Sequence, residues 1–122
     1  MKPANLIVIM SDEHDPRYMG CSGHPLVKTP TFDKMAANGV RFTNAYTPCP
    51  ICVPARAAFA TGQYVHRIRH WDNAMPYTGS IRGWGHVLQE NSIRGEPIGK
   101  LHYRHAEDPA GFDIEHIPMN VY

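Results

Sequence analysis

A cysteine, a proline and an arginine stand at alternate positions near the middle of the chain, as Cys52, Pro54 and Arg56. Proline is accepted in the first turn of a helix, so this spacing predicts a helix that begins near Pro54. Unpaired N–H groups and the helix dipole at such a terminus favour a thiolate or another anion. A guanidinium four residues after the cysteine can bind a tetrahedral anion over the same face. The alternative is a structural helix with a buried cysteine and a surface arginine.

An acidic cluster follows the most apolar segment of the chain. Asp12, Glu13 and Asp15 come directly after Leu6–Met10. In open α/β sheets, ligands gather beyond the carboxyl ends of the strands. Carboxylates in that place suit a hard divalent cation with oxygen ligands, calcium or magnesium. The alternative for the same residues is a hydrated acidic turn.

The elements that position these residues begin with a strand. Residues 5–10 form a continuous apolar run, which is typical of a strand buried on both faces of a parallel sheet. Residues 11–28 contain glycines and a proline and predict a long surface loop. A cap and first-turn proline at Thr29-Pro30 predict a short amphipathic helix that ends at Gly39. Residues 40–46 then favour a second strand, which would complete a βαβ-like unit.

Beyond the predicted helix that starts near Pro54 and stops before Gly62, the pattern is weaker. Residues 63–83 show no clear period and are interpreted as a polar loop. Trp84–Asn91 predicts a third short helix, followed by an irregular strand around Glu96–Leu101. The fold class expected is therefore α/β, the N-terminal part of a mostly parallel sheet flanked by helices. The sheet is expected to be incomplete in this chain, with exposed edges and an uncovered face.

Size and composition limit the class of protein. The chain has 122 residues, which bounds it to one domain or a piece of one, and 43% of them are hydrophobic, which excludes a disordered chain. Twelve basic residues against 11 acidic ones give a net charge of +1, and no nucleic-acid partner is expected. No apolar run approaches the ~20 residues of a membrane span. Because no cleavable signal is recognised at the start, the expected compartment is the cytoplasm.

The run from Cys52 to Gly62 resembles the signature of the formylglycine-dependent sulfatase family, part of the alkaline phosphatase-like superfamily. That signature is C-x-P-x-R followed by small and apolar residues and T-G, here Thr61-Gly62. Thr47-Pro48, the strand and acidic turn of residues 5–12, and Gly99-Lys100-Leu101-His102 extend the likeness in the family's order. The resemblance identifies residues 1–122 as an N-terminal fragment of a sulfatase-type catalytic α/β domain.

The resemblance also implies roles. Cys52 would be converted to formylglycine, and Arg56 would hold the modified residue and offset negative charge in the transition state. Lys100 and His102 match a G-K-x-H pair in which the lysine touches the sulfate and the histidine touches a hydroxyl of the nucleophile. Asp12 would be the first ligand of a divalent cation, with Ca²⁺ expected and Mg²⁺ or Mn²⁺ as alternatives. Glu13 and the modified Cys52 complete the predicted ligands.

The chain departs from the family in two respects. Many arylsulfatases carry a second aspartate where this chain has Glu13. Members are also several-fold longer, and they draw further metal ligands, another histidine and a second lysine from later segments that cannot be located here. The remaining C-terminal part of the enzyme is therefore an expected partner, beside a small sulfate ester. A homo-oligomer is left open, and no membrane partner is expected.

Other functions also fit parts of the pattern. Phosphonate monoester and phosphodiester hydrolases share the cysteine motif and the metal edge, and their substrates are also tetrahedral anions. Cys49 and Cys52 form a C-x-x-C pair before a helix, as in thiol oxidoreductases, but that function leaves Arg56 and the Lys100/His102 pair unexplained. A zinc module lacks a second ligand pair. The alcohol that carries the sulfate is not determined by these residues.

Overall fold

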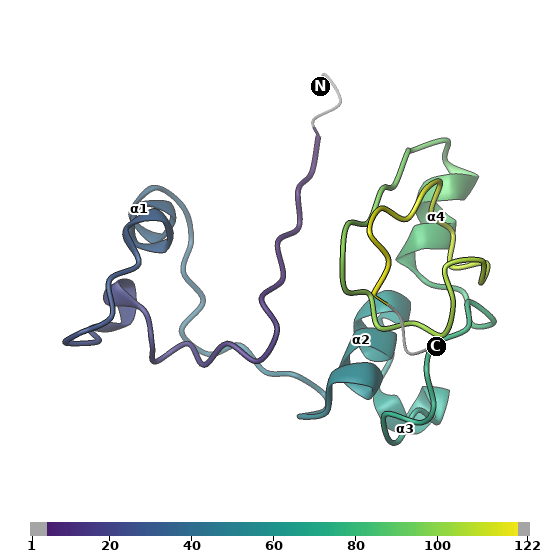
Figure 1. Ribbon diagram of the computed structural model, residues 1–122, viewed down its shortest axis with the longest axis horizontal. Helices are drawn as coiled ribbons and strands as arrows, with labels where there is room; N and C mark the ends of the chain where they lie inside the picture. Colours follow the sequence, from purple (N-terminus) through teal and green to yellow (C-terminus); the bar gives the residue numbers. More distant parts are fainter. Residues whose placement is uncertain (1–4, 120–122) are drawn as a thin grey trace. The chain divides into compact units, whose positions relative to one another are not determined.

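The computed structural model describes residues 5–119, and within it the chain divides into two compact units, Met1–Ala45 and Tyr46–Tyr122. The helices are η1 (Gly20–Ser22) and α1 (Pro30–Asn38) in the first unit. The second unit contains α2 (Cys52–Thr61), α3 (Val65–Ile68) and α4 (Trp84–Glu90) (Figure 1). None of the helices in residues 5–119 has the length and apolarity needed to cross a bilayer.

In the first unit, α1 begins at Pro30 as predicted and packs against η1. Thr29 joins the two, because its hydroxyl accepts from the Gly20 N–H (2.8 Å) and donates to Asp33 Oδ1 (2.9 Å). A further hydrogen bond runs from the Cys21 N–H to the same Oδ1 of Asp33 at 2.6 Å. Polar contacts therefore hold η1 to the first turn of α1, and no hydrophobic side chain in the described part of this unit is buried.

The predicted sheet is not formed in the described residues. Residues 5–10 run as an extended thread in Figure 1, and they and residues 40–46 carry no ladder. Residues 96–101 were also predicted as a strand. Within residues 5–119, the β-pairing found there is one isolated parallel bridge between Ile98 and His116. The strand predictions are not confirmed, because a strand exists only through its partner strands and, within residues 5–119, none pairs with residues 5–10 or 40–46.

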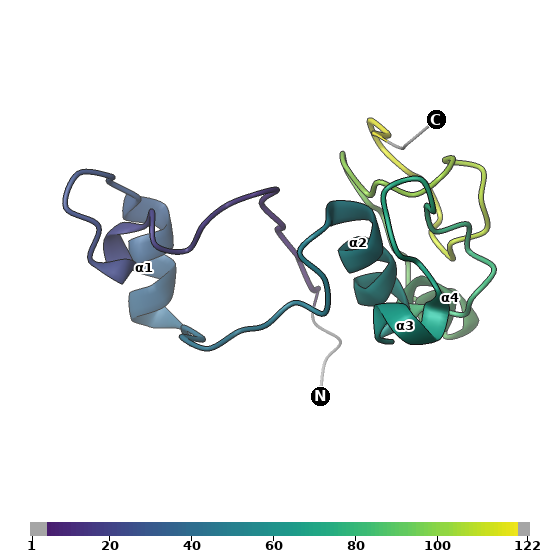
Figure 2. The same ribbon diagram turned by 90° about the horizontal axis from the view of Figure 1, so that it is seen from below.

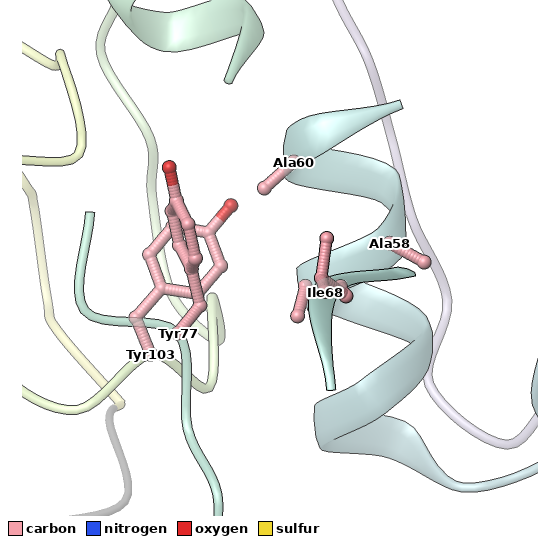
Figure 3. Close-up of a cluster of buried hydrophobic side chains, with 6 residues drawn as sticks. Ala58, Ala60, Ile68, Tyr77 and Tyr103 are labelled. Carbon is pink, nitrogen blue, oxygen red and sulfur yellow. The ribbon is translucent and has the colours of Figure 1, made fainter. Parts of the chain in front are cut away.

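The second unit has a hydrophobic core built on α2. Ala57, Ala58 and Ala60 of α2 are buried in one cluster with Ile68 of α3 and the rings of Tyr77 and Tyr103. Figure 3 shows Ala60 on the side of α2 that faces the two rings. The two rings meet edge to face, with centroids 4.9 Å apart. Because alanine has no side chain beyond Cβ, the aromatic rings can approach the helix closely, and Tyr77 is only 1% exposed.

The segment after α4 folds back over the helices of this unit, as Figure 2 shows. Gly111 adopts a left-handed backbone (φ 85°), and a Cβ at this position would overlap the backbone of Gly85 and His86 in α4. Only glycine combines this conformation with so close an approach. The contact fixes residues 109–112 on α4 and so closes the core from its C-terminal side.

Candidate active site

The signature cysteine is the first residue of α2. Ile51 is the N-cap in an extended conformation (φ −102°, ψ 137°), and its side chain gives the helix no hydrogen bond. The helix therefore begins two residues before the predicted start at Pro54, which becomes its third residue. Proline is tolerated there because the N–H groups of the first turn have no intrahelical acceptor in any case.

The missing cap is supplied from a loop 21 residues further along the chain. Asn73 Oδ1 accepts a hydrogen bond from the Val53 N–H at 3.1 Å and lies 3.4 Å from Cys52 Sγ, which donates to it. Sequence reasoning placed Asn73 in a polar loop without a role. An asparagine in a loop signals a turn, but no local pattern connects position 73 with position 52.

The cap changes what the helix terminus can bind. Pro54 has no N–H, and the N–H of Val53 is taken by Asn73. Within residues 5–119, the Cys52 N–H is left as the one donor of that turn without an acceptor. The hydrogen bond from the Val53 N–H to Asn73 lowers the number of N–H groups that an anion could reach here. Anion binding at this helix terminus stays a prediction.

Arg56 lies one turn after Cys52 and is half-buried. Its Nη1 donates to the carbonyl oxygen of Lys100, 44 residues later in the chain. This contact brings the C-x-P-x-R motif and the predicted G-K-x-H motif together, although nothing in their spacing requires it. The structure thus assembles Cys52, Arg56 and Lys100 in one region of the second unit.

Tyr103 follows His102 and is buried in the core of this unit. Burial strongly raises the pKa of Tyr103, Tyr77 and Glu115 act in the same direction, and the positive charge of Arg56 opposes it. Sequence reasoning assigned no role to Glu115, which belongs to no recognised motif.

His102 follows Lys100 on the same segment and has a left-handed backbone (φ 62°). Its N–H donates to the Met119 carbonyl at 3.3 Å. Histidine is among the residues that adopt this conformation more often than most, so the backbone alone assigns His102 no function. The role of His102 stays a prediction from the sequence motif.

The acidic residues predicted as metal ligands belong to the first unit. Asp12 and Glu13 are exposed on a turn, and Glu13 is also left-handed (φ 55°). Asp15 is committed elsewhere, because Arg17 Nε donates to its Oδ1 (3.0 Å) and Arg17 Nη2 to its Oδ2 (2.5 Å). These hydrogen bonds lower the pKa of Asp15 to about 2. Asp12 and Glu13 stay the candidate ligands that the sequence predicts in this turn.

These two carboxylates fit a hard cation in chemical type but not in number. Calcium takes about 6–8 oxygen ligands. Within residues 5–119 no group of three or more His, Cys, Asp and Glu side chains is arranged to hold a metal ion. A complete site therefore requires ligands beyond those of the turn, and the metal role of Asp12, Glu13 and Cys52 stays a prediction.

The model of the sulfatase family matches residues 4–99. The chain belongs to the sulfatase family. It is 35% identical over 112 residues to an N-acetylglucosamine-6-O-sulfatase of Bacteroides thetaiotaomicron, which covers 92% of this chain and 20% of that relative. It is 35% identical over 99 residues to arylsulfatase K of Bos taurus, covering 81% of this chain and 18% of the relative. A choline-sulfatase of Rhizobium meliloti is 31% identical over 118 residues, 97% of this chain and 23% of the relative.

The chain thus spans about a fifth of the length of these curated sulfatases. The family match confirms the resemblance found in the sequence, and with it the α/β class. It also includes the segments around Cys52, Arg56 and the turn of Asp12 and Glu13. Lys100 and His102 both lie just beyond the matched residues, so their roles depend on the G-K-x-H motif.

Proposed function

We propose that this chain forms the nucleophile-bearing part of a hydrolase of sulfate monoesters. The observation that carries the proposal is the hydrogen bond from Arg56 Nη1 to the Lys100 carbonyl, since it joins the segment of the predicted G-K-x-H motif to the helix of the C-x-P-x-R motif. The relatives bear the names of sulfatases for an amino sugar, for choline and for aryl esters. They agree on a sulfate ester and differ on the alcohol, which this proposal leaves open.

The proposed nucleophile is formylglycine made from Cys52. The side chain fits that modification, because Cys52 is a free cysteine at the first position of α2 and is not fully buried. Once hydrated, a formylglycine supplies one hydroxyl that attacks sulfur and a second whose deprotonation releases the sulfate. A hydroxyl in this position can also donate to Asn73 Oδ1, as the thiol does.

The chain's own charged residues bind and stabilise the substrate. The guanidinium of Arg56, one turn from residue 52, offsets the negative charge that grows on the sulfate oxygens in the transition state. Lys100 is proposed to contact the sulfate, and His102 to hydrogen-bond a hydroxyl of the nucleophile. Asp12 and Glu13 are proposed as two of the ligands of a divalent cation, with Ca²⁺ as the first choice. Such a cation would supply positive charge that polarises the ester oxygens.

The modification gives the most direct test. The protein is produced in a host with a working maturation enzyme, and the peptide containing residue 52 is examined by mass spectrometry. Formylglycine lowers its mass by about 18 Da. An unmodified cysteine in such material would count heavily against the proposal.

The second arm of the experiment measures activity. Full-length protein that contains this chain is expected to hydrolyse an aryl sulfate, and phosphonate monoesters are tested beside it. Preference for the phosphonate would replace the sulfatase proposal with the phosphonate hydrolase alternative. The 122 residues alone, modified and supplied with calcium, are expected not to turn over, because Asp12 and Glu13 give too few ligands. Multiple turnover by the isolated chain would contradict this.

A further inference from the structure

Asn73 makes more contacts than a helix cap requires. Capping α2 needs one acceptor for the Val53 N–H, at 3.1 Å. The same oxygen also takes the hydrogen bond from Cys52 Sγ at 3.4 Å. One side-chain oxygen therefore ties the first turn of the helix to the reactive atom of residue 52.

The loop that carries Asn73 is itself held in shape. Asp72 Oδ1 accepts from the Ala74 N–H at 2.8 Å, and the Asp72 carbonyl accepts from the Met75 N–H at 3.3 Å. This turn presents Asn73 to α2 in one orientation. A side chain that is positioned by its own turn loses little entropy when it forms a further contact.

We propose that Asn73 is a positioning residue for the nucleophile at position 52, an inference that rests on the proposed function. A side chain at the start of a helix can occupy several staggered rotamers, and attack requires the one that aims its reactive atom at the bound ester. A thiol and a hydroxyl both donate hydrogen bonds, so Asn73 Oδ1 holds residue 52 before and after modification. The neutral amide does this without repelling an anionic sulfate, as an aspartate would.

The kinetic test uses the full-length enzyme with Asn73→Ala. The expected result is a fall in kcat of about 10²-fold, with KM changed by less than about threefold, since orientation and not substrate affinity is lost. Asn91→Ala is the matched control. Asn91 is an exposed asparagine of the same unit whose Nδ2 donates to the Val87 carbonyl at a helix end (2.8 Å), and its replacement is expected to leave kcat unchanged.

A rescue variant separates positioning from capping. Ile51 is 40% exposed and already has the extended backbone of an N-cap, so Ile51→Ser supplies a local cap for α2. In the Asn73→Ala background it is expected to restore the Tm and leave kcat low. If kcat returns together with the Tm, Asn73 acts only as a cap and the proposal is overturned.

A measurement on the unmodified 122-residue chain does not depend on sulfatase activity. Alkylation of Cys52 is followed by peptide mass spectrometry, with Cys21 and Cys49 as internal references. Asn73→Ala is expected to speed alkylation at Cys52 several-fold and to leave the two references unchanged. Equal rates at Cys52 would overturn the positioning contact. An inactive wild-type enzyme with faster alkylation in Asn73→Ala would instead mean that the proposed function fails while the contact stands.

Discussion

The two units of this chain handle their apolar residues in opposite ways. In the second unit, the helix that carries Cys52 and Arg56 packs its alanines against Ile68, Tyr77 and Tyr103. In the first unit, the apolar run ahead of Asp12 is open, and Ile7 and Ile9 are each 80% exposed. The predicted nucleophile and its arginine thus stand on an element with its own core. The predicted metal ligands stand on a turn after residues 5–10, which pair with no strand within residues 5–119.

The difference between the packed helix α2 and the unpaired residues 5–10 follows from what each kind of element needs in order to be stable. A helix satisfies its own backbone hydrogen bonds and needs only one covered face, whereas a strand needs at least one neighbouring strand. In the second unit, Ile68, Tyr77 and Tyr103 pack with the alanines of α2. Within residues 5–119, no neighbouring strand pairs with residues 5–10.

The largest expected effect comes from matched glycine substitutions in the two units. Gly111 (φ 85°) and Gly23 (φ 84°) are both left-handed, but a Cβ at Gly23 meets nothing within 4 Å. Gly111→Ala is expected to prevent cooperative folding of the second unit, because its Cβ overlaps the backbone of α4. Gly23→Ala is expected to cost about 1 kcal/mol of backbone strain alone. Thermal unfolding followed by near-ultraviolet circular dichroism measures both. Similar Tm values for the two variants would contradict the close packing at Gly111.

The next effect compares the proposed chemistry of the units in the full-length enzyme. Arg56→Lys keeps the charge but loses the planar group that forms two parallel hydrogen bonds, and kcat is expected to fall about 10²–10³-fold. Glu13→Gln keeps an oxygen ligand on the exposed turn and is expected to change kcat less than about tenfold at saturating calcium. Steady-state kinetics on an aryl sulfate give both values.

Cys49→Ser serves as the control for that pair. Cys49 lies outside α2, and the sulfatase proposal gives it no role, so activity is expected to stay within about tenfold. A C-x-x-C oxidoreductase needs both sulfurs and has no use for the guanidinium. Loss of activity in Cys49→Ser with near-normal Arg56→Lys would favour the oxidoreductase.

A smaller effect separates buried from exposed isoleucines. Ile68 is 5% exposed and Ile7 is 80% exposed. Ile68→Ala is expected to destabilise the second unit by about 2–5 kcal/mol, through lost burial and the cavity left behind. Ile7→Ala in the same 122-residue chain is expected to stay within about 0.5 kcal/mol. Urea unfolding reports both, and a large loss from Ile7→Ala would show that the apolar run is covered in solution.

The smallest effect is a titration in the first unit. Hydrogen bonds from Arg17 lower the pKa of Asp15 to about 2. Since the folded pKa lies below the ordinary value, the contribution of Asp15 to stability is present above about pH 4 and is lost as the pH falls towards 2. Carboxyl chemical shifts from NMR are expected to show a midpoint near 2, and Arg17→Gln is expected to return it to about 4. An unchanged midpoint in the variant would contradict the ion pair.

The sequence predicted helices well and strands poorly, for one physical reason. Caps and breakers are local, so Thr29-Pro30 and Gly39 marked α1, and Gly62 marked the end of α2. The strand predicted at residues 5–10 depends on partners distant in sequence. The short helix α3 was missed inside a polar loop, because one turn of helix leaves no period to detect.

The candidate site was predictable where a motif is contiguous. Cys52, Arg56 and the Lys100/His102 pair follow from their spacing and the family likeness. Asn73 and Glu115 do not, because their places near Cys52 and Tyr103 are created by folding alone. Contacts between residues that are far apart in the chain cannot be predicted from the local sequence around either residue.

The open apolar run at residues 6–10 also bears on how the chain behaves at high concentration. Leu6, Ile7, Val8 and Ile9 form an uncharged run with strong strand preference and no proline, and all four are exposed. Such a segment is a template for strand pairing between molecules, so it favours aggregation. We therefore expect this run to promote aggregation of the purified chain, and we expect Ile7→Lys to reduce it because a charge within such a segment opposes strand pairing.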